Sequence, residues 1–264
     1  MADESVDGSE ALVEQVARAF EARTPLRIRG GDSKAFLGRP VAGDELDTRI
    51  HRGIVKHDPS ELVVTVRAGT PLDHLNRVLD DAGQMLACES PVFDGRATVG
   101  GTVASGLAGP RRPWSGSVRD FVLGCRIITG RGKHLRFGGQ VMKNVAGYDL
   151  SRLMAGSFGA LGVITEVSLK VMPHPRARRC MTVSVDAGEA LRQLSGWRRA
   201  SLPISGACHV DGQLHVRLEG GRGSVSAAAD RLGGEAHEET FWAALRDHAL
   251  PFFADPRPLW RLSL

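Results

Sequence analysis

Aromatic residues and long apolar runs are scarce in this chain of 264 residues. Aromatic side chains make up 5% of it, with a single tyrosine, and none interrupts the short arginine groups such as Arg111–Arg112. Basic clusters without aromatic stacking platforms are weak evidence for nucleic-acid binding, so we expect no nucleic acid partner despite a net charge of +4. No apolar run approaches the roughly 20 residues of a membrane span, so no transmembrane segment is predicted.

The four cysteines do not have the spacing of metal ligands. Cys88, Cys125, Cys180 and Cys208 form no C-x-x-C pair and have no histidine at ligand spacing. This argues against an iron–sulfur cluster or a structural zinc site in this chain, and we predict no metal site. The acidic start MADESVDGSE has no signal-peptide pattern, which favours a cytoplasmic protein.

Several common catalytic motifs are missing. No G-x-G-x-x-G follows a strand pattern, and no G-x-x-x-x-G-K-[ST], H-E-x-x-H or G-x-S-x-G occurs. A Rossmann nucleotide site, a P-loop, a zinc hydrolase and a serine hydrolase therefore have no support.

Glycine, in contrast, is abundant, with 32 residues, and many of them lie between residues 97 and 165. These glycines interrupt apolar, β-branched segments such as ATVGGTVASGLAG. A chain without Cβ atoms turns tightly and lets a flat or anionic ligand reach its backbone amides. The alternative is a fold with many tight turns, but the spacing is not that of hairpin turns, and we favour a cofactor cradle.

A second glycine-containing segment, TPLRIRGGDSK, begins as a short strand over residues 26–29. Gly30, Gly31, Asp32, Ser33 and Lys34 follow, and such a loop binds an anion through its amides, a hydroxyl and a cation. A plain turn with an incidental lysine explains this pentapeptide equally well.

Hydrophobic periodicity predicts helices starting near Ser9 and Thr70, each capped by that residue, and a hairpin around residues 130–132. After Pro173 the pattern changes to β-α-β-β-α, the order of a ferredoxin-like unit. We therefore expect two domains, residues 1–175 and 176–264. The second is predicted to lack its last strand and to be cut short at its C-terminus, because PRPLWRLSL resembles only the start of a strand.

Four segments together carry a family resemblance: RIRGGDSK, DPSELVVTVRAGTPLDHLNRVL, ATVGGTVASGLAGPRRPWSGSVRDFVLG and SFGALGVITEVSLKVMP. They resemble the FAD-binding domain of the vanillyl-alcohol-oxidase/PCMH flavoprotein superfamily. VMKNVAGYDLSRLMAGSFGALGVITEV and LWRLSL are similar to the smaller flavin subunits of bacterial glycolate oxidases. The resemblance implies an α+β fold, in which a two-subdomain PCMH-type FAD-binding domain is followed by an incomplete ferredoxin-like α/β cap domain.

The resemblance also implies cofactor contacts in four groups. The loop that would bind the pyrophosphate comprises Gly30, Gly31, Asp32, Ser33 and Lys34, and the segment that would run along the flavin contains Gly100, Gly101, Thr102, Ser105, Gly106 and Gly109. The entry to the strand near residue 163 would contact the cofactor through the backbone of Gly162, Val163 and Ile164. Two further residues, Asp120 and Val122, would lie beside the cofactor.

The residue at position 32 predicts how the flavin is held. Superfamily members with covalently attached flavin commonly have histidine after the two glycines, whereas this chain has Asp32. We therefore expect non-covalent FAD. A carboxylate beside a pyrophosphate is repulsive, so we expect Asp32 to accept loop amides while Lys34 offsets its charge.

Catalytic residues are not identified by any motif. Hydride transfer from a 2-hydroxy acid needs an arginine for the carboxylate and a base for the hydroxyl proton. Tyr148, His209 and Arg217 are weak candidates, and for the last two a core or surface role is the simpler interpretation. Lys143 and Asn144 lie near Tyr148 in a polar cluster that either lines the site or anchors a loop.

The resemblance implies an FAD-binding subunit of a glycolate oxidase or dehydrogenase that oxidises glycolate to glyoxylate. It implies two partners, a larger flavin subunit and an iron–sulfur subunit, and membrane contact only through them, at the inner face of the cell membrane. Two alternatives remain: a non-catalytic structural or electron-transfer flavin subunit of that complex, and a stand-alone flavin oxidase for another hydroxy acid.

Overall fold

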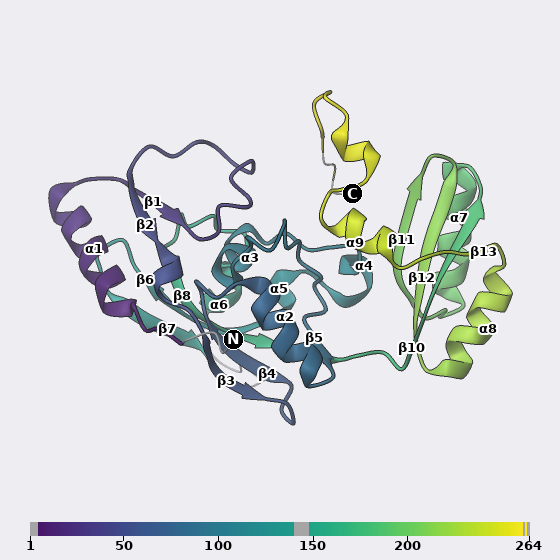
Figure 1. The fold of residues 1–264 in the computed structure, drawn as a ribbon, viewed down its shortest axis with the longest axis horizontal. Helices are drawn as coiled ribbons and strands as arrows, with labels where there is room; N and C mark the ends of the chain where they lie inside the picture. The colour runs from purple at the N-terminus through teal and green to yellow at the C-terminus, as the bar shows by residue number, and fades with distance from the viewer. Residues whose placement is uncertain (1–4, 140–147, 261, 263–264) are drawn as a thin grey trace. The chain divides into compact units, whose positions relative to one another are not determined.

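The computed structural model describes residues 5–139, 148–260 and 262. Its contacts divide the chain into two compact units. Unit 1 comprises Met1–Ala108 and Gly116–His174, and unit 2 comprises Gly109–Ser115 and Pro175–Leu264 (Figure 1). A short segment from the middle of the first unit's sequence thus belongs to the second unit, and each unit is described by itself.

Unit 1 is built on an antiparallel sheet of five strands. Its order is β3 (Ile54–Asp58), β4 (Val63–Arg67), β8 (Val163–Lys170), β6 (Val122–Ile128) and β7 (His134–Gly138). Val64 and Val66 face the apolar core, whereas Thr65 lies on the opposite face, 2.9 Å from the hydroxyl of Ser168. The strands β6 and β7 confirm the predicted hairpin.

Helices supply the other half of this core. They are α2 (Leu72–Asp81), α3 (Val99–Ser105), α5 (Val118–Phe121) and α6 (Leu150–Leu153). In α2, Leu72, Leu75 and Leu79 are fully buried, as their helical spacing predicts. The predicted cap was wrong: Pro71 takes the N-cap position, and the Thr70 hydroxyl instead donates to the Arg67 carbonyl at 2.7 Å.

A small parallel sheet pairs β1 (Leu26–Arg29) with β2 (Asp44–Asp47), which leads into the short helix η1 (Thr48–Ile50). Helix α1 (Ser9–Ala22) buries Leu12 and Val16 in a satellite cluster with Leu46 of β2. Its N-cap is Gly8, not Ser9. Two short strands, β5 (Gln84–Met85) and β9 (Met172–Pro173), also pair.

Unit 2 has the predicted β-α-β-β-α order and one further strand. Its elements are β10 (Ala177–Ser184), α7 (Ala187–Arg199), β11 (Ile204–Val210), β12 (Gln213–Gly220), α8 (Arg222–Leu232) and β13 (Glu235–Ala236). The antiparallel sheet has the order β11-β12-β10-β13, with β12 between the two strands that α7 connects. The expectation of a missing strand was wrong, because β13 pairs with β10 at the sheet edge.

The two faces of the unit 2 sheet differ in character. Leu214, Val216 and Leu218 of β12 are fully buried in an apolar cluster that includes residues of α7 and α8. Alternation along β12 places His215, Arg217 and Glu219 on the opposite face. Helix α9 (Thr240–Arg246) lies there, with the Phe241 ring stacked on His215.

Two further short helical elements belong to unit 2. The helix α4 (Arg112–Ser115) contacts β11, and η2 (Pro251–Ala254) follows α9. Residues 255–260 and 262 contain no strand, so the expected strand start in PRPLWRLSL is not seen in that part of the segment. Within the described ranges, no helix combines the length and apolarity needed to cross a bilayer.

Replacing the fully buried Leu75 tests the core of unit 1. We expect Leu75→Ala to lower the free energy of unfolding by about 2–5 kcal/mol, because the helix cannot collapse onto the vacated space. Urea unfolding followed by far-UV circular dichroism measures this. The control is Leu191→Ala on α7, where the leucine is 68% exposed and the expected change is within about 0.5 kcal/mol. Equal effects would show that α2 does not pack as described.

Candidate functional site

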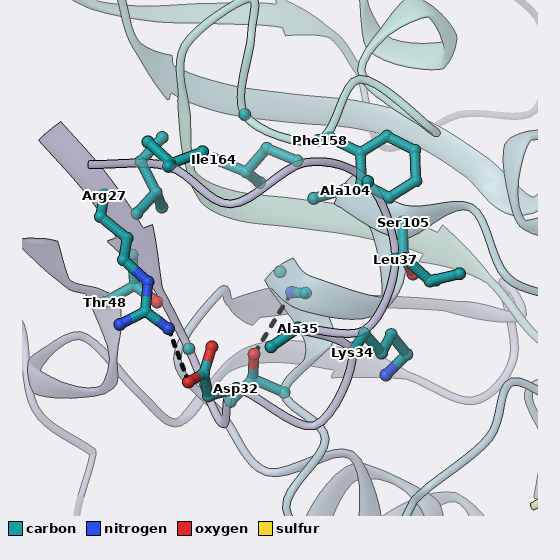
Figure 2. A pocket seen from close by; sticks show the side chains of 18 of the residues that line it. Arg27, Asp32, Lys34, Ala35, Leu37, Thr48, Ala104, Ser105, Phe158 and Ile164 are labelled. Carbon is teal, nitrogen blue, oxygen red and sulfur yellow. Dashed lines mark hydrogen bonds and ion pairs between the residues drawn. The ribbon is translucent and has the colours of Figure 1, made fainter. Parts of the chain in front are cut away.

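A cavity of about 830 Å³ lies within unit 1, where β1 ends and the loop at residues 30–41 begins. Its other walls are η1, α3 and the segment at residues 158–164 (Figure 2). This volume lies in the range of cavities that hold cofactors and other small molecules. It is therefore the candidate binding site of unit 1.

The cavity brings together most of the residues predicted to contact a cofactor. Those that line it are Gly30, Gly31, Asp32, Ser33, Lys34, Gly100, Gly101, Ser105, Gly162 and Ile164. They come from three segments far apart in the chain. The structure thus joins the loop after β1, the glycine-rich helix α3 and the entry to β8 around one space.

Other predicted cofactor residues do not line the cavity: Thr102, Gly106, Gly109, Asp120, Val122 and Val163.

Four of these six are held elsewhere by the fold. Thr102 is buried, Gly106 ends α3 in the left-handed conformation, and Gly109 belongs to unit 2. Asp120 closes a capping box at the start of α5, where its carboxylate accepts the backbone N–H of Ser117 at 2.7 Å. This hydrogen bond lowers the pKa of Asp120 despite partial burial. Asp120 therefore has a local structural role.

Val122 and Val163 are the other two. Both side chains are buried, 1% and 4% exposed, and they pack in the apolar clusters of unit 1.

The sequence did not single out several side chains that line the cavity. They include Arg27, Leu37, Arg39, Ala104 and Phe158. In Figure 2, Phe158, Ala104 and Ile164 lie on one side of the cavity and Asp32 and Lys34 on the other. Arg27 was detectable, since it alternates with Ile28 on the strand that leads into the loop, but the apolar residues carry no motif.

The glycines of the loop have a packing role. A Cβ atom on Gly30 would overlap the hydroxyl of Thr98, and one on Gly31 would overlap the carbonyl oxygen of Arg96. Thr98 is the N-cap of α3 and accepts the backbone N–H of Gly101 at 3.2 Å. The two glycine-rich segments therefore touch through the space that missing side chains leave, which the sequence argument about ligand approach did not predict.

The loop also presents unused hydrogen-bond donors. The backbone N–H groups of Gly31, Asp32 and Ser33 have no acceptor within the described residues. Asp32 adopts a left-handed conformation with φ of 54°. A left-handed residue in a turn is a feature of the backbone concavities in which successive amides bind an anion. Lys34 lies nearby, its ammonium 5.3 Å from the centroid of the Phe93 ring. Such a loop suits a phosphate group.

The catalytic candidates are not gathered at this cavity. Tyr148 is 95% exposed and does not line it, and His209 in unit 2 bonds through Nε2 to the Val185 carbonyl at 2.8 Å. Lys143 and Asn144 lie outside the described residues. Among the described residues, no group of three or more His, Cys, Asp or Glu could hold a metal ion.

Arg217 belongs to a buried ionic network in unit 2. It is 3% exposed, donates to the Ser205 hydroxyl at 3.0 Å and lies over the Trp242 ring at 4.9 Å. Glu219 on the same strand pairs with Arg111 and, at 2.6 Å, with Arg178.

Glu219 is the central carboxylate of that network. Burial alone would raise its pKa, but the surrounding guanidiniums lower it to about 2. Within unit 2, these contacts give Arg217 a structural role.

The cavity thus combines two kinds of wall. Unused amides and basic side chains suit an anionic group, and Ile28, Ala104, Phe158 and Ile164 suit a flat apolar one. A ligand that carries both is a dinucleotide cofactor. The fold and the site therefore suit a dinucleotide-binding protein.

The comparisons with known proteins specify which dinucleotide is bound. The FAD binding domain family matches residues 6–138, half of the chain. The chain belongs to the FAD binding domain family, and its cofactor is FAD.

Relatives extend the match over nearly the whole chain. The chain is 61% identical to "Glycolate oxidase subunit GlcE" of Escherichia coli (strain K12), over 98% of this chain and 74% of that one. It is 30% identical to "Glycolate oxidase subunit GlcD" of Bacillus subtilis (strain 168), over 66% of this chain and 37% of that one. The fold resembles a solved "alkyldihydroxyacetonephosphate synthase", with a TM-score of 0.72 at 18% identity, over 91% of this chain and 53% of that one.

Proposed function

We propose that the chain is the FAD-binding subunit of a glycolate oxidase complex. The identity of 61% over 98% of its length to a glycolate oxidase subunit carries this proposal. The reaction would convert glycolate to glyoxylate, with the hydroxyl proton passing to a base and the hydride from carbon 2 to the flavin. FAD supplies the two-electron acceptor.

Residues 1–175 would form the FAD-binding domain and residues 176–264 the cap. The division of contacts near residue 174 supports this assignment, with Gly109–Ser115 as an exception. Amides of residues 31–33 and the Lys34 ammonium would hold the pyrophosphate, and α3 and residues 158–164 would line the flavin. Position 32 is an aspartate with no nucleophilic nitrogen, which supports non-covalent FAD.

The complex would also contain a larger flavin subunit and an iron–sulfur subunit. We place it in the cytoplasm, in contact with the inner face of the membrane only through those partners. The matches to two different glycolate oxidase subunits support an assembly of related flavin chains.

A second candidate function is a non-catalytic or electron-transfer flavin subunit of the same complex. Two observations favour it. Among the described residues that line the cavity there is no histidine, and Arg217 contacts Ser205 and Glu219 within unit 2. Substrate would then react at the partner's flavin.

Two readouts on the flavin of this chain, taken together, test the two candidates. The chain would be stripped of FAD, combined with its partner subunits, and assayed for glycolate-dependent reduction of a dye. A catalytic or electron-transferring FAD predicts loss of activity and recovery on adding FAD. A second readout, anaerobic bleaching of the isolated chain's flavin by glycolate, is expected only if this chain carries the reaction. Full activity with the stripped chain would contradict both roles for its flavin.

A further inference from the structure

The loop proposed to hold the pyrophosphate contains a carboxylate in its centre. Asp32 lines the cavity and lies between the free amides of residues 31 and 33. A carboxylate inside this loop repels a phosphate held by the same amides unless a cation compensates its charge. The fold must therefore neutralise Asp32.

Arg27 provides that compensation. Its Nη2 atom donates to Oδ2 of Asp32 at 2.7 Å, and Figure 2 shows the two side chains pointing toward each other. Both are part-buried, with 38% and 33% of the side chains exposed, which limits screening by water. The expectation from sequence that Asp32 accepts loop amides was wrong.

The neighbouring arginine is engaged elsewhere. Arg29 makes a two-pronged contact from Nη1 to both carboxylate oxygens of Glu45, at 2.8 and 2.9 Å, and lies 3.9 Å from Asp32. Arg27 is 3.9 Å from Glu45, its partner residue across the β1–β2 pair. Arg29 thus pairs closely with Glu45, and Arg27 pairs closely with Asp32 of the loop.

We propose that Arg27 is a positioning residue for FAD. It neutralises Asp32 and anchors the left-handed turn at residue 32, so that the ligand meets the loop amides and Lys34 instead of an open carboxylate. This inference rests on the proposed role of the loop in holding the pyrophosphate. It differs from a direct contact, in which Arg27 would leave Asp32 and bind the phosphate itself.

A double-mutant cycle that neutralises each charge in the full chain distinguishes these roles. FAD is titrated into apo-protein, and the quenching of flavin fluorescence gives the Kd of wild type, Arg27→Met, Asp32→Asn and the double variant. Asparagine is isosteric with aspartate and accepts a positive φ, so the turn is kept.

We expect Arg27→Met to weaken FAD binding by about tenfold, Asp32→Asn to bind at least as tightly as wild type, and the double variant to return within about threefold of wild type.

Other outcomes count against the inference. A double variant as weak as Arg27→Met would mean that Arg27 contacts the phosphate directly, and an unchanged Kd for Arg27→Met would mean that Arg27 has no role. Arg18→Met is the matched control, because it breaks an ion pair with Glu14 at 3.8 Å on α1 where both side chains are about 70% exposed. A wild-type chain that takes up no FAD would overturn the proposed function and this inference together. If the wild-type chain binds FAD tightly, the variants test the role of Arg27 alone.

Discussion

Gly31→Ala is expected to remove most FAD binding while leaving unit 2 folded. The added Cβ would overlap the carbonyl oxygen of Arg96, which is backbone and cannot rotate away. The loop must shift away from the segment before α3, and its amides shift with it. Overpacking of this kind costs about 1–3 kcal/mol, so the affinity for FAD should fall by about 5- to 150-fold and the melting temperature of unit 1 should drop. Flavin-fluorescence titration and far-UV melting measure the two effects.

Gly130→Ala is the matched control for this variant. Gly130 lies in the β6–β7 hairpin of the same unit, and a Cβ there would meet nothing within 4 Å. Its Kd for FAD should equal that of wild type. If both variants bound FAD normally, the contact between the loop and the segment before α3 would not shape the site.

Glu219→Gln is expected to destabilise unit 2 by about 3–5 kcal/mol at neutral pH, because it leaves buried guanidiniums without their carboxylate. The sign of the pH dependence follows from the pKa of Glu219, which is about 2 in the folded chain against an ordinary value of 4.5. A lowered folded pKa gives stability that is present above about pH 4.5 and lost as the pH falls toward 2. The Glu219→Gln variant should show no such loss of stability between pH 4.5 and pH 2.

Tryptophan fluorescence reports the unfolding of unit 2, since Trp114, Trp197, Trp242 and Trp260 all belong to that unit. Urea unfolding would be followed at several pH values. Glu189→Gln is the control, because Glu189 pairs with Arg192 at 2.8 Å on the exposed face of α7, where solvent screens the ion pair. A Glu219→Gln variant as stable as this control would contradict the buried network.

Local patterns in the sequence predicted the elements well. Leu72, Leu75 and Leu79 recur at helical spacing and are buried, and the ferredoxin-like order of unit 2 follows from alternating strands and helices. The strand β13 was missed because two residues, Glu235 and Ala236, carry no periodicity. Pairing with β10, a contact between segments far apart in the sequence, makes Glu235–Ala236 a strand.

The site was predictable only where glycine or charge marked it. Phe158, Ala104 and Leu37 line the cavity through the fold, and no local pattern separates them from core residues. Asp32 was identified as a puzzle, but its partner Arg27 lies on the preceding strand and faces it only once β1 ends in a left-handed turn. Arg111 pairs with Glu219 across 108 positions of sequence, a contact that no motif records.

The most direct test of non-covalent FAD is the visible absorbance of the purified chain before and after acid precipitation. We predict a yellow protein whose flavin is released in full into the supernatant as FAD, with about one FAD per chain. Flavin retained in the pellet would contradict the non-covalent attachment inferred from Asp32. A colourless chain that also takes up no added FAD would contradict the assignment of the cavity as the cofactor site.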